Sequence, residues 1–341
     1  MRDRPRVAML TRDYPPTVGG IPTYAFNLVS QLKRIGVDVD VVEGRGDVKT
    51  LLLPLHWDVR LGDYDLVHVA SLPYAAFVGF HPLVVTTHSP VTEEGKYYGS
   101  SNRLKRPWAS FLEGRSARKA NAIVAVSKAT ATELASRYDV GDKVHVIPNG
   151  VDTSFFAPGR RSSNKVLICS RLDPRKNIGE ALAALGEVGA PLELEVVGEG
   201  PERSRLEGIA SRYRYPHRFT GALPEEELRN AYATARVFVS SSSSEGFGIS
   251  VLQAMAAGCA VVVSDLPAHR ELVDHMANGM VYSREKELAE YVTLLLKNDD
   301  LAEKLGARAR EKAKQYSWES VATRTKELYL SLLSRSSHSG D

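Results

Sequence analysis

The sequence of 341 residues predicts an α/β protein with two doubly wound domains, each a parallel sheet covered by helices. Three observations predict this class. Short apolar runs rich in β-branched residues alternate with amphipathic helical patterns. The runs are continuous, which is typical of strands buried on both faces of a sheet. The series restarts after a polar stretch near residue 160.

The apolar runs predict strands in both halves of the chain. In the first half these are RVAML, VDVDVV, DLVHVA, PLVVTTH, AIVAVS and KVHVIP, and in the second KVLICS, LELEVVG, HRFTG, VFVSS and CAVVVS. A helix is expected at Tyr24–Ile35, after the first strand and a glycine-rich loop. Another is expected at Glu225–Ala235, because Pro224 and acidic residues mark a helix start.

The domain ranges follow from the stretch Ala157–Lys165, where Gly, Pro, Ser and Arg gather without periodicity. An N-terminal Rossmann-like domain is expected at 1–157 and a C-terminal one at 158–316. The last helix, at 317–333, has an apolar face that suits either domain, the N-terminal one included. The tail at 334–341 is expected to be disordered.

Composition and charge limit the function. Lys and Arg number 44 and Asp and Glu 41, so the net charge of +3 is too small to predict nucleic-acid binding. Cys169 and Cys259 lie in apolar runs and are predicted to be small buried hydrophobes in a reducing compartment. The histidines form no metal-ligand pattern, so no metal is expected. With no visible signal peptide or membrane-spanning run, we expect a cytoplasmic protein, at most peripheral on the inner face of the cytoplasmic membrane.

A glycine-rich loop, TRDYPPTVGGIPTY, follows the first predicted strand. It places Gly19 and Gly20 at a helix start, where free amides and the helix dipole favour an anion. The loop lacks the G-x-G-x-x-G spacing of dinucleotide sites and the Gly-Lys-Ser/Thr of P-loops. By itself it fits an anion site or an ordinary turn equally well.

Two cations follow the first strand of the second domain, in SRLDPRKN. Arg171 and Lys176 leave the carboxyl end of that strand, where ligands bind in open α/β sheets. A guanidinium and an ammonium group there suit a diphosphate. The alternative is a solvated turn with ordinary surface charges.

A carboxylate stands before a helix in the stretch SSSSSEGFGISVLQAMAAG. The first amides of this helix, near Gly248, Ile249 and Ser250, lack intrahelical partners and suit a phosphate. Glu245 would repel that phosphate, so it is better explained by hydroxyls of a neutral group attached to the phosphate, such as a sugar. The alternative is that Glu245 caps the helix electrostatically.

Together these stretches resemble the group 1 glycosyltransferases. The resemblance rests on SRLDPRKN, GEGPE, RFTGALPEEEL, SSSEGFGISVLQAMAAGCAVVVSDLPAHREL and NGMVY in this order, and it extends over nearly the whole chain. It implies the GT-B fold, in which two Rossmann-like domains face each other across a cleft for donor and acceptor. It also implies retaining transfer from a nucleotide-diphosphate sugar, which is a co-substrate, with no obligatory cofactor.

The resemblance also implies roles for residues of this chain. Arg171 and Lys176 would hold the donor diphosphate and neutralise the leaving nucleotide. Glu245 and His88 would contact the donor sugar, and these four are the implied catalytic residues. Further implied contacts are Gly19, Gly20, Ile249 and Ser250 for the diphosphate, Gly246, Phe247 and Gly248 for the sugar, and Gln253, Phe219, Gly221 and Leu223 for the ribose and base.

Gln253 departs from the family pattern. The family's E-x7-E motif begins at Glu245, and its second glutamate, which binds ribose hydroxyls, falls at Gln253. A carboxylate accepts two hydroxyl hydrogens, whereas an amide offers one acceptor oxygen and an NH2 donor. We therefore expect an altered nucleotide affinity or preference, without loss of the chemistry.

A basic and aromatic stretch lies at 96–119. It suits a core helix with a basic exposed face, and it also suits an interfacial patch that docks on anionic lipid beside a lipid-bearing acceptor. The residues expected near the acceptor or membrane are Tyr14, Tyr97, Tyr98, Arg103, Lys105, Arg106 and Trp108.

The expected activity is transfer of a hexosyl group from GDP-mannose or a UDP-hexose to a hydroxyl of a lipid, or of a lipid-linked or cell-surface glycan precursor. The enzymatic alternative is a sugar-nucleotide epimerase or a phosphorylase of the same fold, although a pyridoxal-phosphate lysine signature is not found. The alternative outside the enzymes is a non-catalytic sugar-nucleotide-binding subunit, suggested by Gln253 alone.

Overall fold

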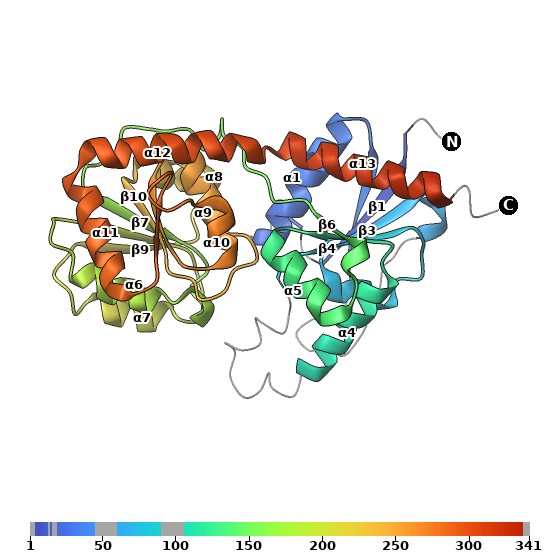
Figure 1. Cartoon of the computed structure of the whole chain (residues 1–341), viewed down its shortest axis with the longest axis horizontal. Coiled ribbons are helices and arrows are strands. Elements are labelled where there is room, and N and C mark those ends of the chain that lie inside the picture. Colours follow the sequence, from blue (N-terminus) through green and yellow to red (C-terminus); the bar gives the residue numbers. More distant parts are fainter. Residues whose placement is uncertain (1–3, 13, 16–18, 45–59, 90–105, 337–341) are drawn as a thin grey trace. The chain divides into compact units, whose positions relative to one another are not determined.

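The computed structural model describes residues 4–12, 14–15, 19–44, 60–89 and 106–336 (Figure 1). The chain divides into two compact units, one formed by Met1–Gly150 with Trp318–Asp341 and the other by Val151–Ser317. The structure thus groups residues 151–157 with the second unit and the final helix with the first. No helix in the described ranges is both long enough and apolar enough to cross a bilayer.

The first unit contains a parallel sheet in the order β2-β1-β3-β4-β5-β6. Its strands are β1 (Arg6–Thr11), β2 (Asp38–Glu43), β3 (Leu66–Val69), β4 (Leu83–Thr87), β5 (Ala122–Ala125) and β6 (Val144–Val146). Its helices are α1 (Gly20–Arg34), α4 (Arg106–Lys119), α5 (Lys128–Tyr138) and α13 (Trp318–Ser336), with 3-10 turns η1 (Leu61–Asp63), η2 (Leu72–Phe77) and η3 (Gly141–Lys143). Each predicted strand of this half is confirmed.

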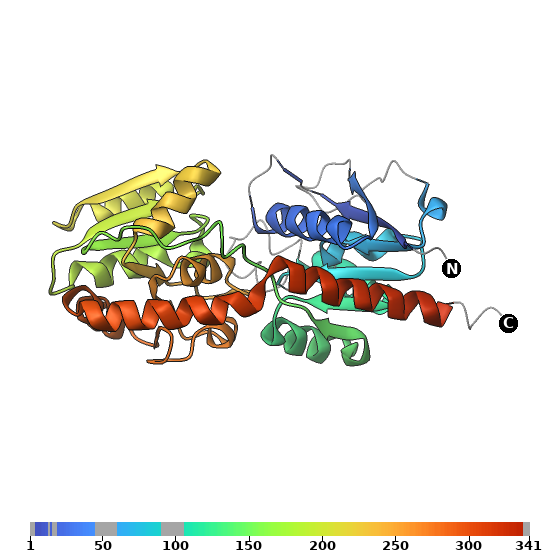
Figure 2. The same ribbon diagram turned by 90° about the horizontal axis from the view of Figure 1, so that it is seen from above.

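Alternation along β1 explains the layers of the first unit. Val7 and Met9 belong to the core cluster that α1 and α13 cover. Ala8 and Leu10 belong to the cluster that η2, α4 and α5 cover on the opposite face. Both faces are therefore buried, as the continuous apolar runs predict. On the first face α1 and α13 lie side by side (Figures 1 and 2).

Helix α1 begins at Gly20, before the predicted start at Tyr24. Its third residue is Pro22, which is tolerated because the first amides of a helix have no intrahelical acceptor. The glycine-rich loop therefore leads directly into the helix, and Gly19 is its N-cap residue.

The second unit contains a parallel sheet in the order β12-β11-β10-β7-β8-β9. Its strands are β7 (Lys165–Cys169), β8 (Glu193–Val197), β9 (His217–Gly221), β10 (Val237–Ser240), β11 (Ala260–Ser264) and β12 (Met280–Tyr282). Its helices are α6 (Ile178–Gly186), α7 (Arg203–Ala210), α8 (Glu225–Thr234), α9 (Ile249–Ala256), α10 (Pro267–Leu272), α11 (Glu285–Lys297) and α12 (Asp299–Ala313), with 3-10 turns η4 (Pro174–Lys176) and η5 (Lys314–Tyr316). The chain runs from β7 outward to β9 and returns on the other side of β7 at β10, so the strand order reverses between β7 and β10.

Arg310 attaches residues 151–157 to the second unit. Arg310 of α12 donates to the carbonyl oxygens of Thr153 and Phe156, each at 3.2 Å, and to that of Ala256 at the end of α9. A charged donor shared by several carbonyls is a strong contact. These bonds explain why residues 151–157 fold with the second unit.

Candidate functional site

Glu245 and Lys176 form an ion pair at the carboxyl edge of the second unit's sheet. Lys176 ends η4, after β7, and Glu245 lies between β10 and α9. Only 12% of the Lys176 side chain and 11% of the Glu245 side chain are exposed. Because β7 and β10 are neighbouring parallel strands, the pair lies where the strand order reverses, which is the usual ligand position in such sheets.

Serines from the run before Glu245 hold this pair. Ser242 Oγ donates to Glu245 Oε1 at 2.8 Å, the same oxygen that contacts Lys176. Ser241 Oγ donates to the backbone carbonyl of Lys176 at 2.9 Å. The serines therefore tie the loop after β10 to the loop after β7. They leave Glu245 Oε2 with no hydrogen bond to any residue in the described part of the chain.

Glu245 is ionised at neutral pH. Burial by itself would raise the pKa of Glu245, but the charge of Lys176 and its hydrogen bond, with contributions from His269 and Arg175, lower it to about 2. A charged acceptor with one unoccupied oxygen suits hydroxyl groups of a ligand.

His269, in α10, lies near Glu245 and is not among the residues that the sequence motifs predict for the site. Its side chain is fully buried, and Nδ1 lies 2.9 Å from the carbonyl oxygen of Ser264. Burial lowers the pKa of His269, so the ring is neutral and its Nδ1–H donates to that carbonyl. Its position after β11, on the same carboxyl edge, is the sequence signal that points to it.

Helix α9 begins without a side-chain cap. Its N-cap residue, Gly248, has φ 97°, a left-handed conformation that favours glycine. The first hydrogen bond of the helix runs from Leu252 N to Gly248 O at 3.0 Å, so the preceding amides, those of Ile249 and Ser250 included, have no intrahelical acceptor. These amides and the helix dipole favour an anion.

Arg171 lies in the same loop as Lys176 but in a different environment. Its side chain is 66% exposed, and its Nε is 3.9 Å from Asp173 Oδ2. The segment GEGPE, residues 198–202, packs closely against this loop. A Cβ on Gly198 would lie 1.9 Å from the carbonyl oxygen of Ser170, and a Cβ on Gly200 would lie 2.2 Å from the carbonyl oxygen of Leu172. Only glycine permits this approach.

The side-chain oxygen of Gln253 accepts a hydrogen bond within the second unit. The buried Tyr232, in α8, donates its hydroxyl to Gln253 Oε1 at 3.1 Å. The amide group of Gln253 can therefore offer its NH2 donors to a ligand. The other residues predicted for the base, Phe219, Gly221 and Leu223, lie in or just after β9, beyond β8 from β7.

His88 belongs to the first unit, just after β4. Its Nε2 lies 3.0 Å from the carbonyl oxygen of Ala70. A carbonyl only accepts, so Nε2 carries the hydrogen and Nδ1 is an acceptor. Burial lowers the pKa of His88 to about 4, so the ring is neutral at pH 7. Tyr24 of α1 contacts the imidazole edge-on, with ring centroids 4.8 Å apart.

The predicted site residues fall into two groups. Gly19, Gly20 and His88 belong to the first unit, and the predicted cations and Glu245 belong to the second. Within the second unit, Lys176 and Glu245 contact each other, whereas Arg171 is bonded to neither in the described structure.

The residues predicted near an acceptor are only partly described. Tyr97, Tyr98, Arg103 and Lys105 lie outside the described residues, as does the side chain of Arg106. Tyr14 is partly buried and contacts Phe26, and Trp108 stacks on Phe111 with ring centroids 5.3 Å apart.

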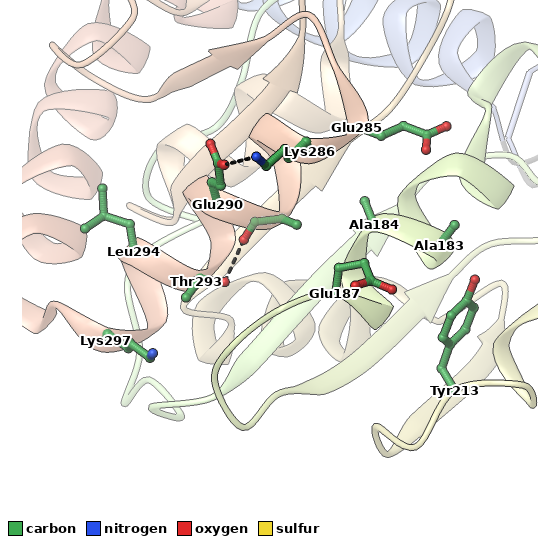
Figure 3. Close-up of a pocket in the computed structure, with 11 residues that line it drawn as sticks. Ala183, Ala184, Glu187, Tyr213, Glu285, Lys286, Glu290, Thr293, Leu294 and Lys297 are labelled. Carbon is green, nitrogen blue, oxygen red and sulfur yellow. Dashed lines mark hydrogen bonds and ion pairs between the residues drawn. The ribbon is translucent and has the colours of Figure 1, made fainter.

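A groove of about 870 Å³ lies between α6 and α11 (Figure 3). Ala183 and Ala184 line it on one side, and Lys286 and Glu290 line it on the other. Lys286 Nζ lies 3.7 Å from Glu290 Oε1. None of the predicted site residues lines this groove, so it is separate from the Lys176–Glu245 pair.

Two family models match the chain. The model described as group 1 glycosyl transferases matches residues 151–312, and that of glycosyltransferase family 4 matches residues 49–155.

Several relatives are similar to this chain in sequence. The MMP alpha-(1->4)-mannosyltransferase of Mycolicibacterium hassiacum is 31% identical over 81% of this chain and 72% of that protein. The phosphatidyl-myo-inositol mannosyltransferase of Mycobacterium tuberculosis is 30% identical over 79% and 74%. The alpha-maltose-1-phosphate synthase of Mycolicibacterium smegmatis is 27% identical over 95% and 98%.

Solved structures share the fold. Sucrose-phosphate synthase from Thermosynechococcus elongatus has a TM-score of 0.81 at 22% identity, covering 97% of this chain and 100% of that one. Anabaena HepE in complex with UDP-glucose has a TM-score of 0.76 at 19% identity, covering 96% and 100%. With the two parallel six-stranded sheets, these likenesses confirm the predicted α/β class with two Rossmann-like domains of the GT-B type.

Proposed function

Because the chain belongs to the group 1 glycosyltransferases and is a hexosyltransferase, we propose that it moves a hexosyl group, with retention, from GDP-mannose or a UDP-hexose to a hydroxyl acceptor. The acceptor is a lipid, or a lipid-linked or cell-surface glycan precursor. The observation that carries the proposal is the buried Lys176–Glu245 pair at the strand-order reversal, beside a helix whose first amides have no intrahelical acceptor.

The proposed donor site divides its tasks among these groups. Lys176 uses one N–H on Glu245 and has two further N–H donors for phosphate oxygens. Arg171, exposed and planar, suits the same diphosphate. Glu245 Oε2 accepts a sugar hydroxyl, next to the backbone of Gly246, Phe247 and Gly248.

The proposed chemistry needs no protein nucleophile. The bond from the sugar C1 to the phosphate oxygen breaks, and a bond from C1 to the acceptor oxygen forms on the same face. The acceptor's proton passes to the leaving phosphate. Catalysis then comes from positioning and from stabilising charge on the diphosphate, which the cations and α9 amides supply. His88, neutral and with Nδ1 as an acceptor, orients a hydroxyl of the sugar.

The donor preference is testable by thermal shift, since a ligand that binds the native state raises Tm with its occupancy. GDP-mannose, UDP-glucose and UDP-N-acetylglucosamine are screened first, and transfer is then measured with the stabilising donor. The relatives named for mannosyl transfer and the UDP-glucose complex of HepE support these choices. Transfer is expected to persist in EDTA, because Arg171 and Lys176 neutralise the diphosphate. Binding without transfer or hydrolysis would favour a non-catalytic subunit, and an inverted anomeric product would refute retention.

Gln253→Glu is expected to preserve or tighten nucleotide binding. A glutamate can accept the Tyr232 hydroxyl on one oxygen and a ribose hydroxyl on the other. Nucleotide Kd is measured by calorimetry for both proteins, with Glu285→Gln on α11 as a control of exposed charge. Loss of binding would contradict the placement of Gln253 at the ribose.

The proposed contact surface for lipid acceptors is the exposed face of α4, which carries Phe111 and Arg115. Phe111 is 51% exposed, and Arg115 lies over the ring of Phe77, itself 47% exposed, at 5.7 Å. Exposed aromatic rings beside cations suit an anionic lipid surface.

Flotation with vesicles tests this surface. The protein is expected to float with vesicles that contain phosphatidylglycerol and to stay behind with pure phosphatidylcholine. Phe111→Ser should reduce flotation, whereas Leu330→Ser, at a residue 46% exposed on α13, should not. Flotation that does not depend on anionic lipid would remove the proposal.

A further inference from the structure

A chain of hydrogen-bonded side chains crosses the core of the first unit. Tyr329 Oη of α13 contacts Nδ1 of His68 in β3. Nε2 of His68 lies 2.7 Å from Thr86 Oγ1 in β4, and that oxygen lies 2.9 Å from Tyr24 Oη in α1. All four side chains are fully buried. Buried polar groups are costly unless they are bonded, and a bonded chain holds each ring in one orientation.

Tyr24 connects this chain to His88. Its ring meets the imidazole edge-on, with centroids 4.8 Å apart and planes at 79°. The same ring contacts Trp318, the first residue of α13, with centroids 6.2 Å apart. Helix α13 thus reaches Tyr24 twice, directly through Trp318 and through the hydroxyl chain that ends at Tyr329.

His88 needs such support for its ring. The hydrogen bond from Nε2 to the Ala70 carbonyl, at 3.0 Å, fixes one ring atom and leaves rotation about that bond. The Tyr24 ring edge restricts this rotation, so the Nδ1 lone pair keeps one direction.

We infer that Tyr24 is a positioning residue that fixes the imidazole of His88, and that α13 holds Tyr24 through Trp318 and through the chain Tyr329–His68–Thr86. This inference rests on the proposed role of His88 at the donor sugar. Helix α13, near the C-terminal end of the chain, then supports His88, a site residue in the N-terminal half.

Two variants test the inference, with a matched control. Tyr24→Leu removes the ring, and Thr86→Val cuts the hydroxyl chain with little change of shape. Thr325→Val is the control, because Thr325 is fully buried on α13 and its hydroxyl donates to the Val321 carbonyl one turn before it, at 2.8 Å. We expect kcat to fall about tenfold for Tyr24→Leu and about threefold for Thr86→Val, because the His88 imidazole is then misplaced. Donor KM should change less than about twofold.

Nuclear magnetic resonance of ¹⁵N-labelled histidine supplies a readout that does not depend on turnover. The wild-type protein should show sharp His88 signals of a tautomer protonated at Nε2, and the two variants, whose ring is less restrained, should show shifted or broadened His88 signals. Thr325→Val should match the wild type. If Tyr24→Leu does not fold, Thr86→Val carries both measurements.

The outcomes separate the inference from the proposed function. If His88→Ala abolishes transfer while the folded variants match Thr325→Val in kcat and in the His88 signals, the inference is overturned. If His88→Ala retains wild-type turnover, the proposed role of His88 is overturned, and the shift and width of the His88 signals then decide whether Tyr24 holds the ring.

Discussion

Lys176→Ala is expected to lower kcat by about 10²–10³-fold, because it removes the cation proposed to stabilise the departing diphosphate. We expect Lys176 to make the larger of the two cationic contributions, since its side chain is 12% exposed and charge interactions strengthen with burial. Arg171→Ala, at a side chain 66% exposed, should cost about tenfold to a hundredfold. Steady-state kcat and donor KM are measured at saturating acceptor.

The control for this loss is Lys286→Ala. Lys286 lies on α11 of the same unit, with 87% of its side chain exposed, and should show wild-type kinetics after substitution. Circular dichroism of Lys176→Ala is required too, because that variant leaves the Glu245 carboxylate buried without its cation. Near-normal rates for both Lys176→Ala and Arg171→Ala would refute the diphosphate assignment.

Glu245→Gln is expected to lower kcat by about 10²-fold, because a neutral amide forms a weaker hydrogen bond to a sugar hydroxyl than a charged acceptor does. The amide also loses the ion pair with Lys176. Transfer kinetics with the preferred donor measure this effect, and Glu285→Gln serves as the control.

The same substitution should change the pH dependence of stability. The pKa of Glu245 is lowered from 4.5 to about 2, so its ionised form favours the folded state. This contribution, on the order of 3 kcal/mol, is present above about pH 5 and is lost as the pH falls toward 2. Urea unfolding at neutral pH and at about pH 3 should show a smaller loss of unfolding free energy in Glu245→Gln than in the wild type. Equal losses would contradict the assignment of the charge.

Local pattern determined most of the elements. The apolar runs predicted β1 to β11, because continuous β-branched stretches leave few other ways to bury their side chains. The run of β12, Met280–Tyr282, does not predict a strand because it is short and only one of its three residues, Val281, is β-branched. Within the stretch 96–119, Phe111 is exposed and Leu112 is buried, since adjacent positions on a helix point in different directions.

The sequence by itself determined the α/β class, the two-part organisation and the residue types of the candidate site, since these depend on local apolar pattern and on motifs at the ends of strands. Only the tertiary structure decided which of those residues meet. Lys176 and Glu245 are 69 positions apart and His68 and Tyr329 are 261 apart, and they are paired because parallel strands and a returning helix bring distant segments together. The physical reason is that apolar periodicity specifies which face of an element is buried, whereas the order of strands and the docking of α13 depend on packing between elements.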